Sequence, residues 1–290
     1  MARREDQRIS NALFGTAVIL GIVLGAWVLS RRYDLPHPSP RATETGARSE
    51  SRFSYTVRHP QYDNLFYGVP GPADTIIERE GYALGYSEKH KQAVWVQYVM
   101  TAGEATSRAA RRRGDFRSDP EIPSGSATPD DYVQSGYDRG HLAPAADMAF
   151  SVRTMSESFY MSNIGPQLPG FNRGVWSRLE KQIRHFAKRE KLIVVVTGPI
   201  LPTEKTVTIG ASRITVPQCY YKVVYDTTPP EKMIAFVIPN WSSTADLRTF
   251  VVSVHQVEKL TGLDFFSLIP QPKQKHLERS ITVENWDWIK

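Results

Sequence analysis

Residues 135–141, with the sequence Ser-Gly-Tyr-Asp-Arg-Gly-His, restrict the local backbone more than any other stretch of this 290-residue chain. Asp138 is of the type that fixes a turn by accepting hydrogen bonds from backbone N–H groups, and Gly140 permits backbone angles that a side chain forbids. The stretch therefore predicts a tight loop that brings Arg139 and His141 to one place. A histidine can take a proton from water near neutral pH, and an arginine suits a phosphate. Taken alone, a histidine after a glycine is more often structural, so its meaning depends on partners elsewhere.

A second stretch at close range supplies such partners. Residues 161–167 read Met-Ser-Asn-Ile-Gly-Pro-Gln, residues 171–176 read Phe-Asn-Arg-Gly-Val-Trp, and Leu-Glu follows at 179–180. Together with the Asp-Arg-Gly-His stretch, this pattern resembles the DNA/RNA non-specific endonuclease family, which includes mitochondrial endonuclease G and secreted sugar-nonspecific bacterial nucleases. The resemblance extends over about residues 82–270. It implies an α+β protein with the ββα-metal (His-Me finger) nuclease fold and a central mixed, mostly antiparallel sheet.

The resemblance also implies roles for individual residues. His141 is expected to be the general base that activates water, and Asn172 to hold a single divalent ion, Mg²⁺ or alternatively Mn²⁺. An amide oxygen suits such a hard, mostly hydrated ion. Glu180 is expected to accept hydrogen bonds from water around the ion, and Arg139 and Arg184 to contact the phosphate. With an ordinary pKa for His141, activity is expected to fall as the pH drops through about 6.5.

Further residues are expected to support this site. Members of the family also use an arginine upstream of the histidine, and the spacing leaves both Arg113 and Arg117 open for that contact with substrate. Asp138, Gly140 and Asn163 are assigned to shaping the loop and the end of the sheet. These residues are therefore expected to act through structure rather than in the chemical step.

The residues after position 170 have helical periodicity. Apolar and amide side chains recur at helical spacing at Val175, Leu179, Gln182, Ile183 and Phe186. They predict a helix over residues 173–188 with Asn172 at or near its N-cap and Trp176 in the core. Asn172, Glu180 and Arg184 lie on one face of this helix. A regular helix would separate Asn172 and Glu180 by roughly 12 Å along its axis, so their joint role requires bridging water or an irregular first turn.

The remaining elements follow from alternating or continuous apolar runs. Strands are expected within residues 76–86, 93–99, 192–197, 220–225 and 233–238. The first two are expected to form a hairpin of the main sheet, and the run at 192–197 to be a central strand buried on both faces. Ser253 and Gln256 match a capping box, and Gly262 marks a C-terminus, so a helix is expected between them.

Charge gives weaker information. The formal net charge is +6, but the first 52 residues hold eight of the 36 basic and five of the 30 acidic residues, which leaves a surplus of three in the remainder. Global charge therefore does not identify a nucleic-acid binder. Basic residues cluster locally before the histidine, at Arg108, Arg111, Arg112, Arg113 and Arg117. With Cys219 as the single cysteine, an intramolecular disulfide is excluded, and a buried thiol is expected.

The N-terminal region has a different character. Residues 12–29 carry no charge and would span about 27 Å as a helix, close to a bilayer core of about 30 Å. We expect a flank at 1–11, a transmembrane anchor at 12–30, a flexible Pro-rich tether at 31–52 and a nuclease domain at 53–290. A cleaved signal peptide or a mitochondrial presequence fits less well. Arginines flank both sides of the anchor and leave its orientation open, so the domain is expected in the bacterial periplasm or in the mitochondrial intermembrane space.

The function expected from these features is a membrane-anchored, Mg²⁺-dependent, non-specific endonuclease that hydrolyses phosphodiester bonds in DNA and RNA. Two alternatives remain open at this point: a catalytically idle nucleic-acid-binding domain on an anchor, and a phosphodiesterase acting on small or lipid phosphates. Because the family often forms dimers, a homodimer is one expected assembly. The sequence does not distinguish DNA from RNA preference, or internal from terminal cleavage.

Overall fold

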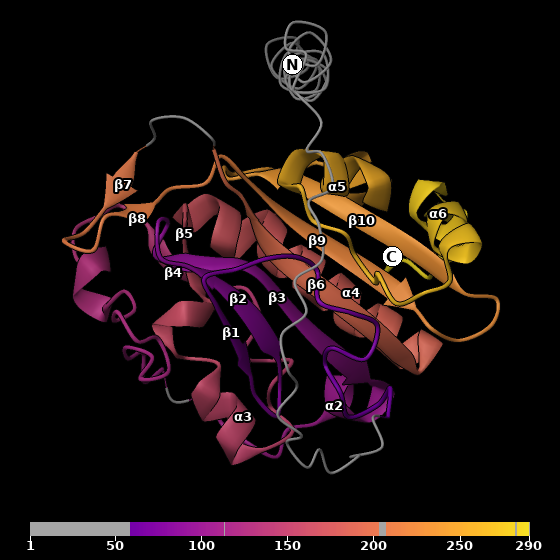
Figure 1. The fold of residues 1–290 in the computed structure, drawn as a ribbon, viewed down its shortest axis with the longest axis horizontal. Helices are drawn as coiled ribbons and strands as arrows, with labels where there is room; N and C mark the ends of the chain where they lie inside the picture. Colours follow the sequence, from indigo (N-terminus) through magenta and orange to yellow (C-terminus); the bar gives the residue numbers. More distant parts are fainter. Residues whose placement is uncertain (1–58, 113, 203–206, 282, 290) are drawn as a thin grey trace, which may run out of the picture. The chain divides into compact units, whose positions relative to one another are not determined.

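Runs rich in β-branched and aromatic residues form a seven-stranded sheet, drawn in Figure 1. In spatial order its strands are β1 (Thr75–Glu78), β2 (Ala83–Ser87), β3 (Gln92–Thr101), β6 (Leu192–Ile200), β9 (Cys219–Asp226), β10 (Lys232–Pro239) and β11 (Val251–Val252). Every neighbouring pair in this sheet is antiparallel, so the expectation of a mixed sheet is corrected. The hairpin of β2 with β3 and that of β9 with β10 use short turns, which only antiparallel neighbours permit.

The computed structural model describes residues 59–112, 114–202, 207–281 and 283–289. The expected anchor at 12–30, the tether at 31–52 and Arg113 lie outside these ranges. Within them, no helix has both the length and the apolar character needed to cross a bilayer.

Helices cover both faces of the sheet. On one face, α4 (Ser177–Glu190) packs its apolar side against side chains such as Val195 and Tyr220. On the other face, α5 (Val254–Thr261) and α6 (Gln271–Arg279) pack against a second cluster that contains Val194 and Val196. Strand β6 is therefore buried on both faces, as its continuous apolar run predicts.

The chain between β3 and β6 carries the smaller elements that matter for function. It contains α2 (Ala102–Thr106), α3 (Val152–Glu157), and the short 3₁₀ turns η1 (Pro129–Tyr132) and η2 (Met161–Asn163). It also contains a two-stranded ribbon of β4 (Asp138–His141) and β5 (Ile164–Gln167), paired antiparallel. The Asp-Arg-Gly-His stretch is thus a strand, and the expectation of a tight loop is corrected: the turn lies just before it, at Gly136 with φ +82°. Figure 1 shows this ribbon beside the main sheet.

The ribbon is followed by a wide π-helical turn, η3 (Phe171–Trp176), which leads into α4. Two strands and a helix in this order form the expected ββα unit. The remaining elements are a small ribbon of β7 (Thr208–Ile209) with β8 (Ile214–Thr215), and the turns η4 (Leu247–Phe250) and η5 (Val283–Asn285). Helix α5 has the predicted ends: Ser253 accepts a hydrogen bond from the Gln256 N–H, and Gly262 closes the helix in the left-handed conformation.

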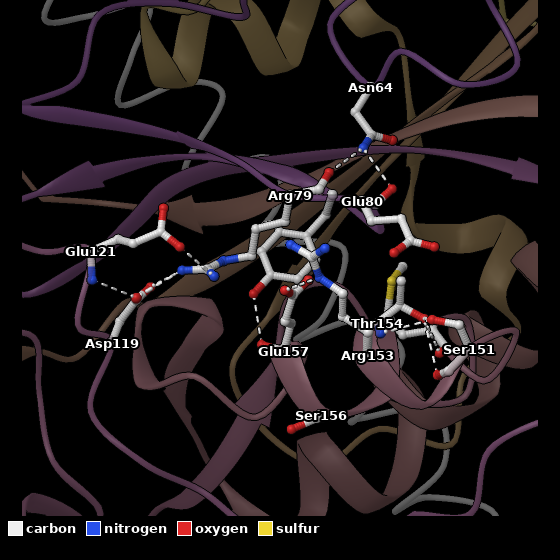
Figure 2. Close-up of polar contacts among 12 residues, drawn as sticks. Asn64, Arg79, Glu80, Asp119, Glu121, Ser151, Arg153, Thr154, Ser156 and Glu157 are labelled. Atoms are coloured by element: carbon white, nitrogen blue, oxygen red, sulfur yellow. Dashed lines mark hydrogen bonds and ion pairs between the residues drawn. The ribbon is translucent and has the colours of Figure 1, made fainter.

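A polar cluster, buried for the most part, connects the first strands to the segments that precede β5. Figure 2 shows Arg79, just after β1, with its guanidinium paired to Asp119 at 2.7 Å and to Glu121 at 2.8 Å. The Asp119 side chain is fully buried and also accepts a hydrogen bond from Ser162 in η2. Tyr82 donates to the Glu157 carbonyl oxygen at 2.8 Å. Because the bonds of Asp119 and Tyr82 are shielded from water, they fix the segments that precede β5 to the sheet.

Candidate active site

His141 lies at the end of β4 among aromatic side chains. Its ring stands perpendicular to Phe159 at 5.0 Å between centroids, and 5.4 Å from the ring of Phe116. Only 7% of its surface is exposed, and its Nε2 is buried without a hydrogen-bond partner among the described residues. An unpaired buried nitrogen costs about 1–3 kcal/mol, so it is typical of a group kept ready for another partner.

The surroundings of His141 also determine its charge. Burial, together with the positive charge of Arg112, lowers the pKa of His141 from 6.5 to about 3. The imidazole is therefore neutral at any pH near neutrality and has a lone pair available for a proton. The expectation of an ordinary pKa near 6.5 is corrected by this burial.

Two residues assigned to structure hold the ribbon that carries His141. Asn163 is fully buried; its Oδ1 accepts from the Ala143 N–H at 2.9 Å, and its Nδ2 donates to the Ala143 carbonyl oxygen at 3.0 Å. Gly140 lies directly beneath Gln167 of β5, and a Cβ there would be 2.1 Å from the Gln167 Cδ. Glycine is thus required by close approach, which corrects the expectation that an unusual backbone angle requires it.

Asn172 is oriented by the same strand. Its Nδ2 donates to Asp138 Oδ2 at 2.9 Å, and Arg173 forms two hydrogen bonds to the same carboxylate at 2.7 and 2.8 Å. Burial raises the pKa of Asp138, but the hydrogen bonds from Arg173 and Asn172 outweigh it and lower the pKa below its usual value. Asp138 is therefore ionised and fixes the amide. Because Nδ2 is engaged, the remaining Oδ1 of Asn172 is the atom that fits a hard divalent ion.

The backbone around Asn172 is not a regular helix. Within η3, Gly174 has φ −102° and ψ −107°, and α4 begins only at Ser177. The Asn172 N–H donates to the Leu168 carbonyl oxygen at 2.9 Å, so Asn172 lies inside the turn, two residues after its N-cap at Gly170. The irregular first turn that a joint role of Asn172 and Glu180 requires is present.

Glu180 and Arg184 follow on α4 within a network of charged groups. Arg184 Nη1 pairs with Asp147 Oδ1 at 2.7 Å, and Tyr98 donates to the other oxygen of Asp147 at 2.8 Å. Burial raises the pKa of Glu180 to about 7, although the positive charge of Lys222 opposes this shift. One guanidinium nitrogen of Arg184 is thus engaged by Asp147, which orients the side chain.

Lys222 of β9 is fully buried beneath this helix. Its Nζ donates to Thr197 and lies 5.1 Å from the centre of the Trp176 ring. Burial lowers the pKa of Lys222 to about 8. Neither Lys222 nor Asp147 was identified from the sequence. A charged residue is unusual within an apolar strand, and this pattern in β9 could have drawn attention to Lys222.

A hollow of about 430 Å³ opens beside Asn172. It is lined by Arg112, Phe116, Pro129, Tyr132, Val133, Tyr137, Asp138, Arg139, Asn172 and Arg173. The guanidinium of Arg139 lies 4.5 Å from the centre of the Phe116 ring. Three guanidinium groups around an aromatic wall form a surface suited to a phosphate backbone. A second hollow, of about 500 Å³, is lined by other residues, among them Pro230 and Leu277.

Among its described arginines, the basic segment before the ribbon contributes Arg112 to the hollow, while Arg117, one of the two expected, binds elsewhere and Arg113 lies outside the described residues. Arg117 donates to the Ser156 carbonyl oxygen at 3.0 Å, pairs with Asp115, and lies over the Tyr160 ring at 4.1 Å. It is absent from the lining of the hollow, whereas Arg112 belongs to it. The spacing in the sequence did not single out Arg112.

Comparisons with known proteins agree with this geometry. Residues 61–271 match the model of the family described as DNA/RNA non-specific endonuclease. The chain is 36% identical over 234 residues to a protein named nuclease from Syncephalastrum racemosum, covering 73% of each chain. It is 37% identical over 223 residues to mitochondrial nuclease EXOG of Xenopus laevis, covering 71% of this chain and 62% of that protein.

A solved structure shares the fold. In the crystal structure of the EndoG/EndoGI complex, one chain superposes with a TM-score of 0.68 at 32% identity, and the match covers 74% of this chain and 95% of that one. The ββα arrangement, the family match and the named relatives lead to one assignment. The chain belongs to the DNA/RNA non-specific endonuclease family and is an enzyme that hydrolyses nucleic acid.

Proposed function

We propose that the protein is a Mg²⁺-dependent endonuclease that cuts both DNA and RNA without base specificity. The main support for this proposal is the hydrogen bond from Asn172 Nδ2 to Asp138 Oδ2 at 2.9 Å. Asp138 and His141 are on the same short strand, so one rigid element positions both the base and the metal ligand. The family relationship supports a divalent ion, and the oxygen of Asn172 suits Mg²⁺.

His141 is the proposed general base. It takes a proton from the attacking water onto a ring nitrogen while the water oxygen forms a bond to phosphorus and the P–O bond to the leaving oxygen breaks. Its ring is neutral near neutral pH, and within the described part of the chain no group bonds to Nε2, so a lone pair is available to the water. The walls formed by Phe116 and Phe159 limit rotation of the ring.

Charge compensation is the other requirement of phosphodiester cleavage. Arg139, Arg112 and Arg173 line the hollow and are proposed to draw the phosphate backbone toward Asn172. Arg184 is proposed to contact the phosphate with the nitrogens that Asp147 leaves free. When bound at Asn172, the divalent ion supplies positive charge for the phosphate oxygens and the leaving oxygen. Glu180 is proposed to accept hydrogen bonds from water near the ion.

The substrate range is tested by salt dependence. The charged side chains that line the hollow are suited to phosphate rather than to base edges, so DNA and RNA are both expected to be cut. If three arginines neutralise phosphates, binding is expected to fall about 40-fold between about 50 and 200 mM salt. Plasmid DNA and a long RNA are compared at several salt concentrations, and R139Q is expected to reduce the salt slope by about one. Cleavage at a single base sequence, or binding that salt does not change, would contradict the proposal.

Activity is expected to fall as the pH drops through about 7, since Glu180 becomes protonated and neutral below its raised pKa. His141 contributes little to this decline, because its pKa of about 3 keeps it neutral. The measurement is kcat/KM against pH for wild type and E180Q. We expect the glutamine variant to be slower and to lack the midpoint near 7. A midpoint near 6.5 that persists in E180Q would show that a histidine titrates instead.

We also propose that residues 12–30 anchor the enzyme in a membrane. The support is the uncharged run in the sequence, and the word mitochondrial in the names of relatives from Xenopus laevis and Saccharomyces cerevisiae favours the intermembrane space over the bacterial periplasm. The full chain is expected to sediment with membranes and to resist alkaline carbonate, whereas a form lacking residues 1–52 should be soluble and active. Intact protein in the soluble fraction would end the anchor proposal.

The two alternatives are less well supported. An idle nucleic-acid-binding domain needs neither an unpaired buried histidine nor an oriented amide, and the relatives are named nucleases. An assay distinguishes a nuclease from a phosphodiesterase that acts on small or lipid phosphates. For a nuclease, hydrolysis of bis-p-nitrophenyl phosphate is expected to be much slower than cleavage of plasmid. EDTA is expected to abolish both activities.

A further inference from the structure

Three carboxylates meet on the face of the sheet opposite α4. Glu258 belongs to α5, Asp264 follows that helix, and Glu278 belongs to α6. One oxygen of each lies within 4.8 Å of the others. Helices α5 and α6 pack with the cluster of Val194 and Val196, whereas α4, which carries Glu180, packs on the other face. The trio is therefore separate from the active site.

The buried carboxyl group of this trio is hydrogen-bonded to Gln274 and Glu258, but one of its oxygens lacks a partner among the described residues. Glu278 is 5% exposed, and its Oε1 is inaccessible to solvent without a hydrogen-bond partner among the described residues. A buried acceptor that is left unpaired is costly, more so when the group is charged. Glu278 thus keeps one oxygen that no described residue bonds to, and it belongs to a group of three acidic side chains.

The protein partly satisfies the other two members. The Phe265 N–H donates to Glu258 Oε1 at 3.1 Å, and Gln274 Nε2 donates to Asp264 Oδ1 at 2.8 Å. His255 Nδ1 lies 3.5 Å from Glu258 Oε2. Within the described ranges, no lysine or arginine nitrogen lies within 4.0 Å of these three carboxylates. Burial and the adjacent Glu258 and Asp264 raise the pKa of Glu278 to about 7, so the trio holds a proton below that pH, and a bound cation would favour its full ionisation.

The donor set restricts the kind of cation. Carboxylate oxygens are hard ligands, which favour Ca²⁺ or Mg²⁺ over softer metals. Ca²⁺ accepts oxygen ligands at roughly 2.3–2.6 Å in flexible geometry, whereas Mg²⁺ requires near-octahedral geometry at about 2.1 Å and gives up its water reluctantly. Three carboxylate oxygens that all lie within 4.8 Å of one another therefore suit Ca²⁺ better.

We propose that Glu258, Asp264 and Glu278 form a second cation site that binds Ca²⁺ and ties α5 to α6. Bound Ca²⁺ offsets the repulsion among the three carboxylates and supplies positive charge to the buried carboxylate of Glu278. Since the trio lies across the sheet from His141 and Asn172, the ion stabilises the domain and takes no part in cleavage.

The test is Ca²⁺ binding and thermal stability of the full chain carrying N172A, which removes the proposed active-site ligand. Calorimetry is expected to give one bound Ca²⁺, and the Tm is expected to rise about 5–10 °C when free Ca²⁺ is near 100 times Kd. Adding E278Q is expected to abolish both effects. Adding E284Q, which changes an exposed carboxylate outside the trio, should leave both intact.

A second variant keeps the test valid if E278Q does not fold. Asp264 is exposed, so D264N is expected to fold and to weaken Ca²⁺ binding at least tenfold even if E278Q does not fold. If N172A binds no Ca²⁺, the carboxylates instead share a proton, and the proposal is overturned. Binding that survives both E278Q and D264N would also overturn it. Because the readout is binding rather than cleavage, the outcome is independent of the proposed nuclease mechanism.

Discussion

Replacing His141 by alanine is expected to lower kcat on supercoiled plasmid by about 10²–10⁴-fold, while Mg²⁺ and DNA still bind. The reason is that His141 is the proposed acceptor of the proton of the attacking water, and the hollow beside Asn172 keeps its arginines when His141 is replaced. The measurement is kcat together with metal and DNA titrations. Circular dichroism checks that the variant still folds, because the substitution leaves a space between Phe116 and Phe159.

The matched variant is N172A, which removes the proposed metal ligand and leaves the base. Its activity is expected to recover partly at high Mg²⁺ or with Mn²⁺, whereas H141A is not rescued in this way. The Asp138 carboxylate would lose one donor and keep Arg173. Near-normal turnover of H141A, or loss of metal binding equal to that of N172A, would show that the two roles are assigned wrongly.

Replacing Asp147 by alanine is expected to reduce the free energy of unfolding by about 3–5 kcal/mol. Asp147 is 1% exposed, and its loss leaves Arg184 without the ion pair and Tyr98 without the acceptor of its hydroxyl proton. Urea unfolding measures the change. Activity is also expected to fall, since Arg184 would no longer be oriented.

The control for this variant is D287A at the surface. Asp287 is 45% exposed and pairs with Arg189, which is 64% exposed, so its replacement is expected to cost roughly 0–1 kcal/mol. If D147A costs no more than D287A, the buried pair contributes little to stability. In that case Arg184 is held by packing alone.

The elements that local periodicity controls could be predicted from the sequence. The apolar run of β6 and the two marked ends of α5 appear as expected, because burial on both faces and helix capping leave a signature in a few adjacent residues. His141, Asn172 and Glu180 were identified through the resemblance to the nuclease family. The sequence alone would have left His141 ambiguous, since a single histidine carries no signal of its surroundings.

What the sequence did not predict depends on contacts between distant segments. The role of Asp147 depends on its contacts with Arg184 and Tyr98, which are both remote from it in the sequence. The pKa of His141 depends on burial and on Arg112, 29 positions earlier, which no local pattern encodes. Gly140 was read correctly as necessary, but the physical reason is the side chain of Gln167 in another strand.

The contact between Asp138 and Asn172 explains why an amide rather than a carboxylate occupies position 172. Asp138 is ionised and accepts a hydrogen bond from the Asn172 amide. An aspartate in that place would offer no N–H group, and two negative charges in contact would push the side chains apart until a cation arrived. With asparagine, the hydrogen bond to Asp138 orients the amide, and so its proposed ligand oxygen, before any ion binds. A neutral amide attracts a cation less strongly than a carboxylate would, but its geometry is already in place.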